Sequence, residues 1–234
     1  MKTKSLVLTT FLLFPLLAGA QSGGFNFYTK AGIDLTSRFE TLQIPTEENE
    51  LFPAPAGSKK NTFSPSIFLE TTYNIFPQTE LGLGMGYIKR KGFLYQGSIV
   101  ERGQVETESY KVNRYSSVPL YVTLKQNYAL NRNMGLYFKT DLGYSLNKTA
   151  DTAYRLYQNN IKQFERPIKF KTKDGFYLGL VIGIEYKSLL AELGYYHSNS
   201  ALSYEQHNPR QRITHSHNSS YNNDALRFSI GFKF

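Results

Sequence analysis

Histidines and serines are the residues of this 234-residue chain best suited to nucleophilic chemistry, because it contains no cysteine. A serine nucleophile needs a histidine base within hydrogen-bond reach. His197 and Ser198 are neighbours in a stretch that alternates between apolar and polar residues. On a strand, adjacent side chains point to opposite faces, so Asn199 rather than Ser198 shares the face of His197. Only a β-bulge would realign the pair, and we therefore predict no catalytic residues.

Three further histidines, His207, His215 and His217, lie in a polar segment near the C-terminus. Neutral imidazoles bind metals, and a His-x-His pair on a strand places two of them on one side. No carboxylate stands at a spacing that would complete a ligand set. We interpret the three as solvated loop residues and predict no metal site and no cofactor.

Ionisable residues recur on one face of the alternating stretches. The carboxylates could suggest a glycosidase or a proton relay, but they are spread over six stretches and nearly balanced by bases. Such a balance favours a structural network of ion pairs. The acids are Asp34, Glu70, Glu80, Asp141, Glu185 and Glu192, and the bases are Lys30, Arg38, Lys125, Lys139, Lys187, Arg227 and Lys233.

Eight segments alternate with the period of two that a β-strand requires. The final segment is the clearest, with Leu226, Phe228, Ile230, Phe232 and Phe234 on one face. It resembles the C-terminal strand of bacterial outer-membrane β-barrels, whose terminal aromatic residue the assembly machinery recognises. We expect the strands at about 25–38, 62–75, 80–87, 118–128, 136–147, 176–187, 189–196 and 226–234.

The connections between these segments alternate in length. Turns near Pro77, Asn131 and Ser188 are short, whereas the connections at about 41–61, 92–110, 149–171 and 203–221 are long and polar. Up-and-down outer-membrane barrels have short periplasmic turns and long extracellular loops. We expect the Pro45–Pro65 stretch to be an irregular surface loop. The pattern predicts an all-β fold, an eight-stranded antiparallel up-and-down transmembrane β-barrel.

In such a barrel the apolar faces contact lipid and the charged faces meet inside. Eight strands leave an interior just wide enough for side chains to fill. Inward glycines would make room for Tyr121, Tyr137, Tyr177 and Tyr196, so we expect a filled interior rather than an open channel. These glycines are Gly82, Gly84, Gly86, Gly143, Gly179, Gly183, Gly194 and Gly231. A soluble lipocalin-like barrel is the main alternative, and it would have the opposite orientation.

The N-terminal segment has the features of a secretory signal. Lys2 and Lys4 precede an apolar run from Leu6 to Leu17, and Ala18-Gly19-Ala20 offers a cleavage site. We therefore predict a signal peptide at 1–20 and one outer-membrane barrel domain at 21–234. The lack of cysteine excludes disulfides and a lipid-bearing cysteine.

Composition agrees with an exported barrel. The formal net charge is +9, yet the longest basic run is Lys89-Arg90-Lys91, so we expect lipopolysaccharide phosphates rather than nucleic acid as the anionic partner. The 18 tyrosines and 17 phenylalanines favour strands and membrane interfaces. A mean hydropathy of −0.39 is too polar for a helical membrane protein. It suits a barrel, in which alternate residues meet lipid.

Four stretches together resemble the small outer-membrane β-barrel proteins of Bacteroidota, called porin family or PorT-like. They are Glu80–Tyr87 with Lys91-Gly92, Ser117–Val122 with Lys125, Gly135–Lys139 through Gly143-Tyr144, and Leu193–Tyr196. The resemblance implies the fold and an outer-membrane location. His197-Ser198 is also similar to the Ser and His of lipid A deacylases, but those enzymes space the pair as H-x-S, whereas Asn199 stands two residues after His197 here.

These observations favour a non-enzymatic protein of the outer membrane, with a structural or adhesive role through its four long loops. A narrow pore for small solutes and an accessory role in protein secretion are the alternatives, followed by lipid A modification. The expected partners are outer-membrane lipid, lipopolysaccharide and envelope or surface proteins. We expect a monomer.

Overall fold

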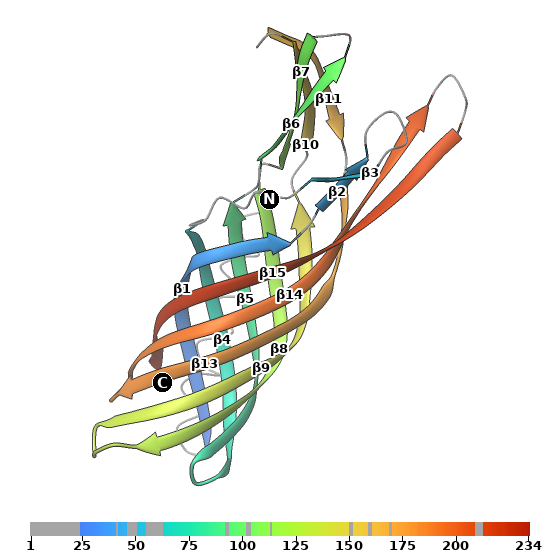
Figure 1. Ribbon diagram of the computed structural model, residues 1–234. Coiled ribbons are helices and arrows are strands. Elements are labelled where there is room, and N and C mark those ends of the chain that lie inside the picture. The colour runs from blue at the N-terminus through green and yellow to red at the C-terminus, as the bar shows by residue number, and fades with distance from the viewer. Residues whose placement is uncertain are drawn as a thin grey trace, which may run out of the picture.

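The computed structural model describes residues 24–40, 42–45, 51–54, 63–91, 94–101, 104–112, 114–149, 152–158, 161–168, 170–208 and 213–234. The predicted signal peptide at 1–20 lies outside them. Eight antiparallel strands of a nine-stranded sheet close into a barrel (Figure 1). They are β1 (Phe25–Glu40), β4 (Ser64–Phe76), β5 (Thr79–Lys91), β8 (Arg114–Ala129), β9 (Met134–Thr149), β13 (Gly175–Tyr186), β14 (Leu189–Asn208) and β15 (Ile213–Lys233).

The barrel closes between its first and last strands. β15 pairs with β14 on one side and with β1 on the other, from Tyr28 opposite Lys233 to Glu40 opposite Asn222. The Phe234 N–H also donates to the Phe27 carbonyl at 2.9 Å. Pairing on both sides satisfies the backbone groups of β15, which a strand in lipid cannot leave free. The predicted fold class is confirmed.

Short turns join strands at one end of the barrel. They are centred on Pro77 and Gln78, on Leu130–Asn133, and on Lys187 and Ser188. We expected Lys187 to face the interior, but that prediction is wrong. The strand ends at Tyr186, and Lys187 occupies the turn with φ of 54° and an exposed side chain.

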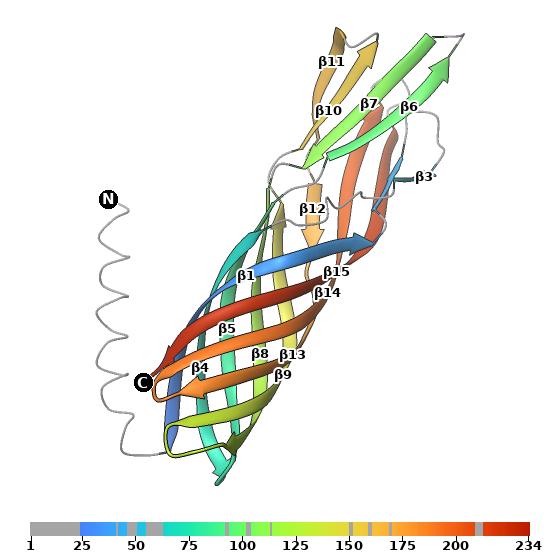
Figure 2. The ribbon, with the colours of Figure 1, turned by 60° about the vertical axis from the view of Figure 1, so that its left-hand side comes forward.

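The long connections contain more strands than the sequence indicated. The Pro-rich connection holds a hairpin of β2 (Leu42–Pro45) and β3 (Leu51–Ala54), not a wholly irregular loop. Two other connections combine into a sheet of order β11-β10-β7-β6 beyond the barrel (Figures 1 and 2). Its strands are β6 (Leu94–Glu101), β7 (Gln104–Val112), β10 (Thr152–Gln158) and β11 (Ile161–Ile168). β12 (Phe170–Lys173) pairs with β14, whose hairpin with β15 continues to Asn208 opposite Ile213.

The barrel is apolar outside and charged inside, the reverse of a soluble protein. Phe138, Leu142 and Phe228 are 49%, 52% and 42% exposed, whereas Lys30, Asp34 and Arg227 are at most 2% exposed. The soluble lipocalin-like alternative is therefore wrong. Among the described residues, no helix is long and apolar enough to cross a membrane. An apolar outer band on a closed antiparallel barrel is the signature of outer-membrane proteins, and the protein is located there.

The pairing register of β1 with β15 shifts at a bulge. Asp34 is opposite Arg227, but Thr36 is opposite Leu226, so the register shifts between them. A shift of one residue moves the following side chains to the other face. Arg38, expected on the inner face, lies opposite Asp224 in this register, and its side chain is outside the described ones. The inward residues of this strand are therefore described only as far as Asp34.

Placing a charge on the outer face tests this orientation. Leu142 lies near the middle of β9, so Leu142→Arg should destabilise the barrel by about 2–4 kcal/mol, the cost of a lipid-facing arginine at mid-bilayer. Phe76→Arg, at the turn end of β4, should cost only about 0–1 kcal/mol. Urea titrations in lipid vesicles, followed by heat-modifiable migration on gels, measure both. Equal costs for the two variants would contradict the orientation.

Candidate functional site

Five charged side chains from four strands meet inside the barrel. The Lys30 Nζ lies 2.5 Å from Oε1 of Glu70 and 3.0 Å from Oε1 of Glu192. The Lys139 Nζ lies 2.8 Å from the same Glu70 oxygen and 3.0 Å from Oδ2 of Asp141. These side chains are all at most 4% exposed. The two lysines thus join β1, β4, β9 and β14 through the interior.

A second cluster centres on Asp34. Its Oδ2 lies 3.0 Å from Nη1 of Arg90, and its Oδ1 lies 2.6 Å from Nε of Arg227. The Arg227 guanidinium also lies 4.7 Å and 4.3 Å from the ring centres of Phe68 and Tyr196, in cation–π range. Arg90 was not among the predicted inward residues, because the alternation predicted a strand that ends at Tyr87, whereas β5 continues to Lys91. Continuing the alternation to Lys91 would have found it.

A third cluster surrounds Lys125 nearer the turns. Its Nζ lies 3.1 Å from Oε2 of Glu185 and 3.4 Å from Oε1 of Glu80. The same ammonium donates to the Tyr28 hydroxyl at 2.9 Å. It also lies 4.4 Å and 4.3 Å from the ring centres of Tyr28 and Tyr137. Carboxylates and ring faces together stabilise this buried charge.

Large tyrosines fill the space that inward glycines leave. A Cβ on Gly84 would overlap the ring of Tyr121, and a Cβ on Gly183 would overlap that of Tyr137. Tyr121 donates to Glu70 at 2.6 Å, so its ring fills space while its hydroxyl binds a carboxylate. The expected filled interior is confirmed for the described barrel residues.

This arrangement makes the inner carboxylates structural groups. Each of the six has a cation within 3.4 Å, as the sequence predicted. A glycosidase or a proton relay needs a carboxyl that can exchange a proton with substrate or water. Five of these side chains are at most 4% exposed, and the sixth, Glu185, is 19% exposed. The paired carboxylates therefore support the barrel from within.

The histidine and serine of the possible esterase pair lie on opposite faces. His197 Nδ1 is 2.7 Å from Oδ1 of Asp224, a carboxylate that also accepts from the Tyr195 hydroxyl at 2.7 Å. Ser198 is 3% exposed on the inner face. Asn199 accepts from the Phe176 N–H at 2.6 Å. The strand pairs without a bulge here, so the structure does not bring Ser198 to His197.

The remaining histidines lie on the outer hairpin. In the register of β14 with β15, His207 is opposite Thr214, His215 is opposite Gln206 and His217 is opposite Tyr204. Their side chains are outside the described ones. Among the described residues, no group of three or more potential ligands gathers in a way that could hold a metal ion.

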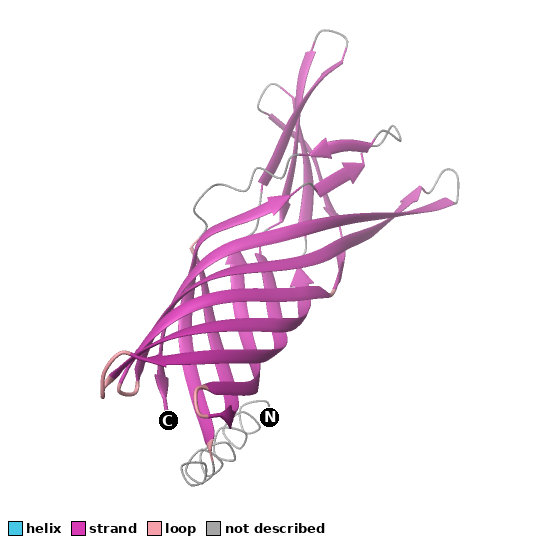
Figure 3. Ribbon diagram, turned by 60° about the horizontal axis from the view of Figure 1, so that its bottom comes forward, coloured by secondary structure: helices cyan, strands magenta, loops and turns pink. Residues whose placement is uncertain are grey.

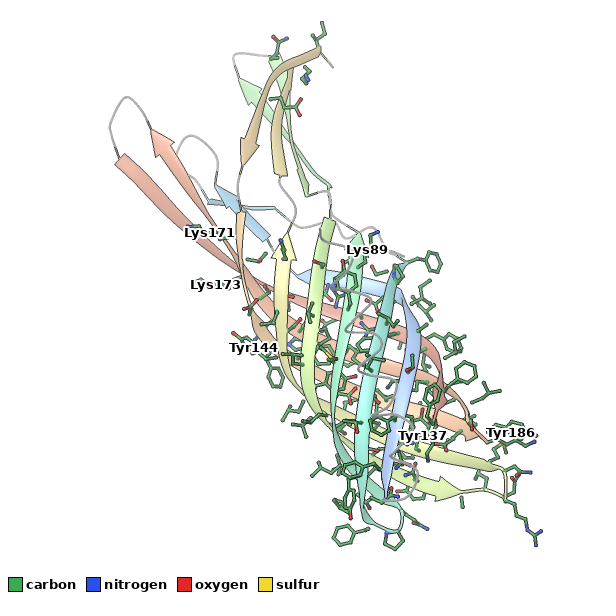
Figure 4. All side chains as sticks on the ribbon, turned by 180° about the vertical axis from the view of Figure 1, so that it is seen from behind. Lys89, Tyr137, Tyr144, Lys171, Lys173 and Tyr186 are labelled. Atoms are coloured by element: carbon green, nitrogen blue, oxygen red, sulfur yellow. The ribbon has the colours of Figure 1, made fainter. Side chains whose placement is uncertain are left out.

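Exposed lysines stand at the outer ends of the barrel strands. Lys89 and Lys148 lie near the ends of β5 and β9, and Lys171 and Lys173 belong to β12. Figure 4 shows Lys89, Lys171 and Lys173 at the end of the barrel opposite to Tyr137 and Tyr186. Cations at this level can contact phosphates at the membrane surface.

No family model matches the chain. The uncharacterized protein PM1543 of Pasteurella multocida strain Pm70 is 37% identical over 244 residues, which cover 100% of this chain and 99% of the relative. OprG of Pseudomonas aeruginosa has a TM-score of 0.45 and 13% identity, over 91% of this chain and 96% of its own. Ail of Yersinia pestis has a TM-score of 0.36 and 11% identity, over 91% of this chain and 99% of the Ail chain. At these TM-scores and identities, no activity of the solved structures is assigned to this chain.

Removing the acid shared by two arginines tests the interior network. Asp34→Asn leaves Arg90 and Arg227 without their common carboxylate, and should destabilise the barrel by roughly 3–5 kcal/mol, the usual cost of breaking a buried ion pair. Glu165→Gln is the control, because it removes an exposed pair with Lys162 worth about 0–1 kcal/mol. Urea unfolding in detergent micelles compares the two. A loss in Asp34→Asn no larger than in the control would contradict the network.

Proposed function

Given that this chain belongs to the same family as the uncharacterized Pasteurella multocida protein PM1543, we propose that it is a non-catalytic outer-membrane barrel that binds surface partners through its extracellular strands. The sheet formed by β6, β7, β10 and β11 is the observation that carries this proposal. It stands on the long-loop side of the barrel, which faces outward in outer-membrane barrels. The partners it would bind are envelope or surface proteins.

The extracellular sheet offers a geometry suited to binding. β10 pairs with β7 from Thr152 opposite Val112 to Gln158 opposite Glu106, so two separate connections share one hydrogen-bonded ladder. Within the described residues, β6 and β11 are the outer strands of this sheet. Outer strands present backbone donors and acceptors to an extended partner segment. A paired ladder also fixes the backbone of its strands, which lowers the entropic cost of binding.

The interior supports a non-catalytic role more than a pore. Lys125, Tyr28 and Tyr137 occupy the cross-section near the turns, and the two lysines Lys30 and Lys139 occupy the middle. Solute passage would require these ion pairs to separate in a low-dielectric space, which is costly. The accessory role in secretion and the resemblance to the PorT-like proteins of Bacteroidota stay predictions.

Lipopolysaccharide is the proposed lipid partner. Lys89, Lys148, Lys171 and Lys173 are exposed at the outer ends of their strands. At this level the phosphates of lipopolysaccharide lie beside the barrel, and lysines near an anionic membrane surface each contribute about 1 kcal/mol of attraction. The protein would bind them as a monomer.

Removing the extracellular sheet tests surface binding. Replacing residues 94–112 and 152–168 with short Gly-Ser linkers should leave the barrel folded, because its ladder does not include these strands. Cells carrying this variant should show fewer cross-links to surface proteins and weaker adherence than cells carrying the intact protein. The control replaces 42–54, which removes only β2 and β3. Full adherence and unchanged cross-links in the first variant would refute the proposal.

Neutralising the outer lysines tests the contact with lipopolysaccharide. A variant with Gln at positions 89, 148, 171 and 173 should retain less lipopolysaccharide on purification, since each lysine contributes about 1 kcal/mol near an anionic surface. Lys162→Gln, in the distant extracellular sheet, is the control. Quantifying lipid A by mass spectrometry in each preparation gives the result. Equal retention by both variants would argue against this contact.

A further inference from the structure

A recess of about 380 Å³ opens at the turn end of the barrel. All three short turns and the C-terminal strand contribute to its lining, and Figure 3 brings this end of the molecule forward. Short turns face the periplasm in outer-membrane barrels. The recess therefore lies on the opposite side of the membrane from the proposed binding sheet, and neither the family nor the proposed function accounts for it.

The floor of the recess is closed and electrically neutral. Glu80 is 1% exposed and accepts from Tyr28 at 2.7 Å, Thr72 at 2.5 Å and Asn127 at 2.8 Å. Glu185 lies 3.1 Å from Lys125 and 3.1 Å from Lys233. Both carboxylates are thus neutralised by lysines of the barrel. They leave no free anion in the recess to attract a cation.

Two cations at the mouth lack such neutralisation. Arg132 and Lys187 belong to different turns, line the recess and are exposed. Among the described residues neither has a carboxylate partner, and the Lys187 ammonium lies 5.6 Å from the centre of the Tyr186 ring. The lining as a whole therefore carries an excess of positive charge. Clefts with one sign of charge concentrate ions of the other sign.

Two side-chain amides contribute uncharged hydrogen-bond donors to the same recess. Asn131 uses its Oδ1 to accept the Asn133 N–H at 2.9 Å, and Asn74 uses its Oδ1 to accept from Asn26 at 3.1 Å. With each oxygen occupied, the NH₂ groups of Asn131 and Asn74 remain as donors at the lining. An N–H donor does not bind a cation, but it donates a hydrogen bond to the oxygens of an anion.

We propose that this turn-side recess binds a small periplasmic anion that carries a carboxylate or a phosphate. Arg132 and Lys187 supply the charge, and the amides of Asn131 and Asn74 supply further hydrogen bonds. The group can belong to a dissolved solute or to the headgroup of an anionic phospholipid in the inner leaflet. A guanidinium forms two parallel hydrogen bonds with either group, which is why the two share one site chemistry.

Titration of the intact protein in nanodiscs of phosphatidylcholine tests the proposal. Inorganic phosphate or acetate should produce saturable shifts in the NMR signals of the Asn131 amide and the Arg132 guanidinium. The double variant Arg132→Gln/Lys187→Gln should weaken phosphate binding by about tenfold or more, because charge-assisted hydrogen bonds are lost. Lys162→Gln, which removes an exposed lysine of the extracellular sheet on the other side of the membrane, is the matched control and should not change binding.

A second variant should act in the other direction. Glu185→Gln releases Lys233 from its ion pair at the recess, so phosphate should bind more tightly than to the unchanged protein. Should this variant fail to fold, the double variant still decides the question, because its two side chains are exposed and make no ion pair in the described structure. Both variants are checked for heat-modifiable migration first.

The lipid source is distinguished by a parallel titration in nanodiscs of phosphatidylglycerol. If a headgroup occupies the recess, the Asn131 and Arg132 signals are already shifted there and inorganic phosphate adds nothing. If the ligand is a solute, phosphate shifts them in both lipids. The proposal is overturned if neither anion gives a saturable shift, if choline binds in place of phosphate, or if the double variant binds phosphate as well as the control.

Discussion

A charge inside an eight-stranded barrel in lipid has neither water nor headgroups to solvate it, so it depends on an opposite charge across the lumen. In this protein the partners come from strands far apart in sequence. Asp34 of β1 meets Arg227 of β15 and Arg90 of β5, and Lys30 of β1 meets Glu70 of β4 and Glu192 of β14. Closure of the barrel between β1 and β15 brings these groups together. Closure and ion pairing therefore stabilise each other.

The same constraint decides where function can lie. Lysines, arginines and tyrosines are buried in the interior of the described barrel. The two ends of the barrel are free of this requirement. One end carries a sheet beyond the membrane, and the other carries a recess whose buried carboxylates are already paired. A barrel of this size can thus serve as a rigid support that presents different chemistry on its two sides.

Much of the fold followed from alternation, and its failures have local causes. Inward charges such as Glu70, Lys139 and Arg227 were predicted because a strand has a strict period of two. Lys187 was predicted wrongly because it lies in a turn, where the period of two does not apply. A bulge after Asp34 likewise shifts the register of Arg38. Arg90 was not predicted to face the interior, because the strand was expected to end at Tyr87, before the basic run Lys89-Arg90-Lys91. The four long connections were expected to be loops, since their polar composition hides the cross-strand pairing that orders β6, β7, β10 and β11.

By itself, the sequence determined that alternate residues face lipid and lumen, how many strands cross the membrane, and which end carries the short turns. These are local properties, set by side-chain periodicity and turn length within one segment. The tertiary structure alone decided which lysine pairs with which carboxylate, that two distant connections share one sheet, and that Arg132 and Lys187 line one recess. Such contacts depend on strand register and closure, which no single segment encodes, because hydrogen-bonded pairing between strands fixes distances between residues remote in sequence.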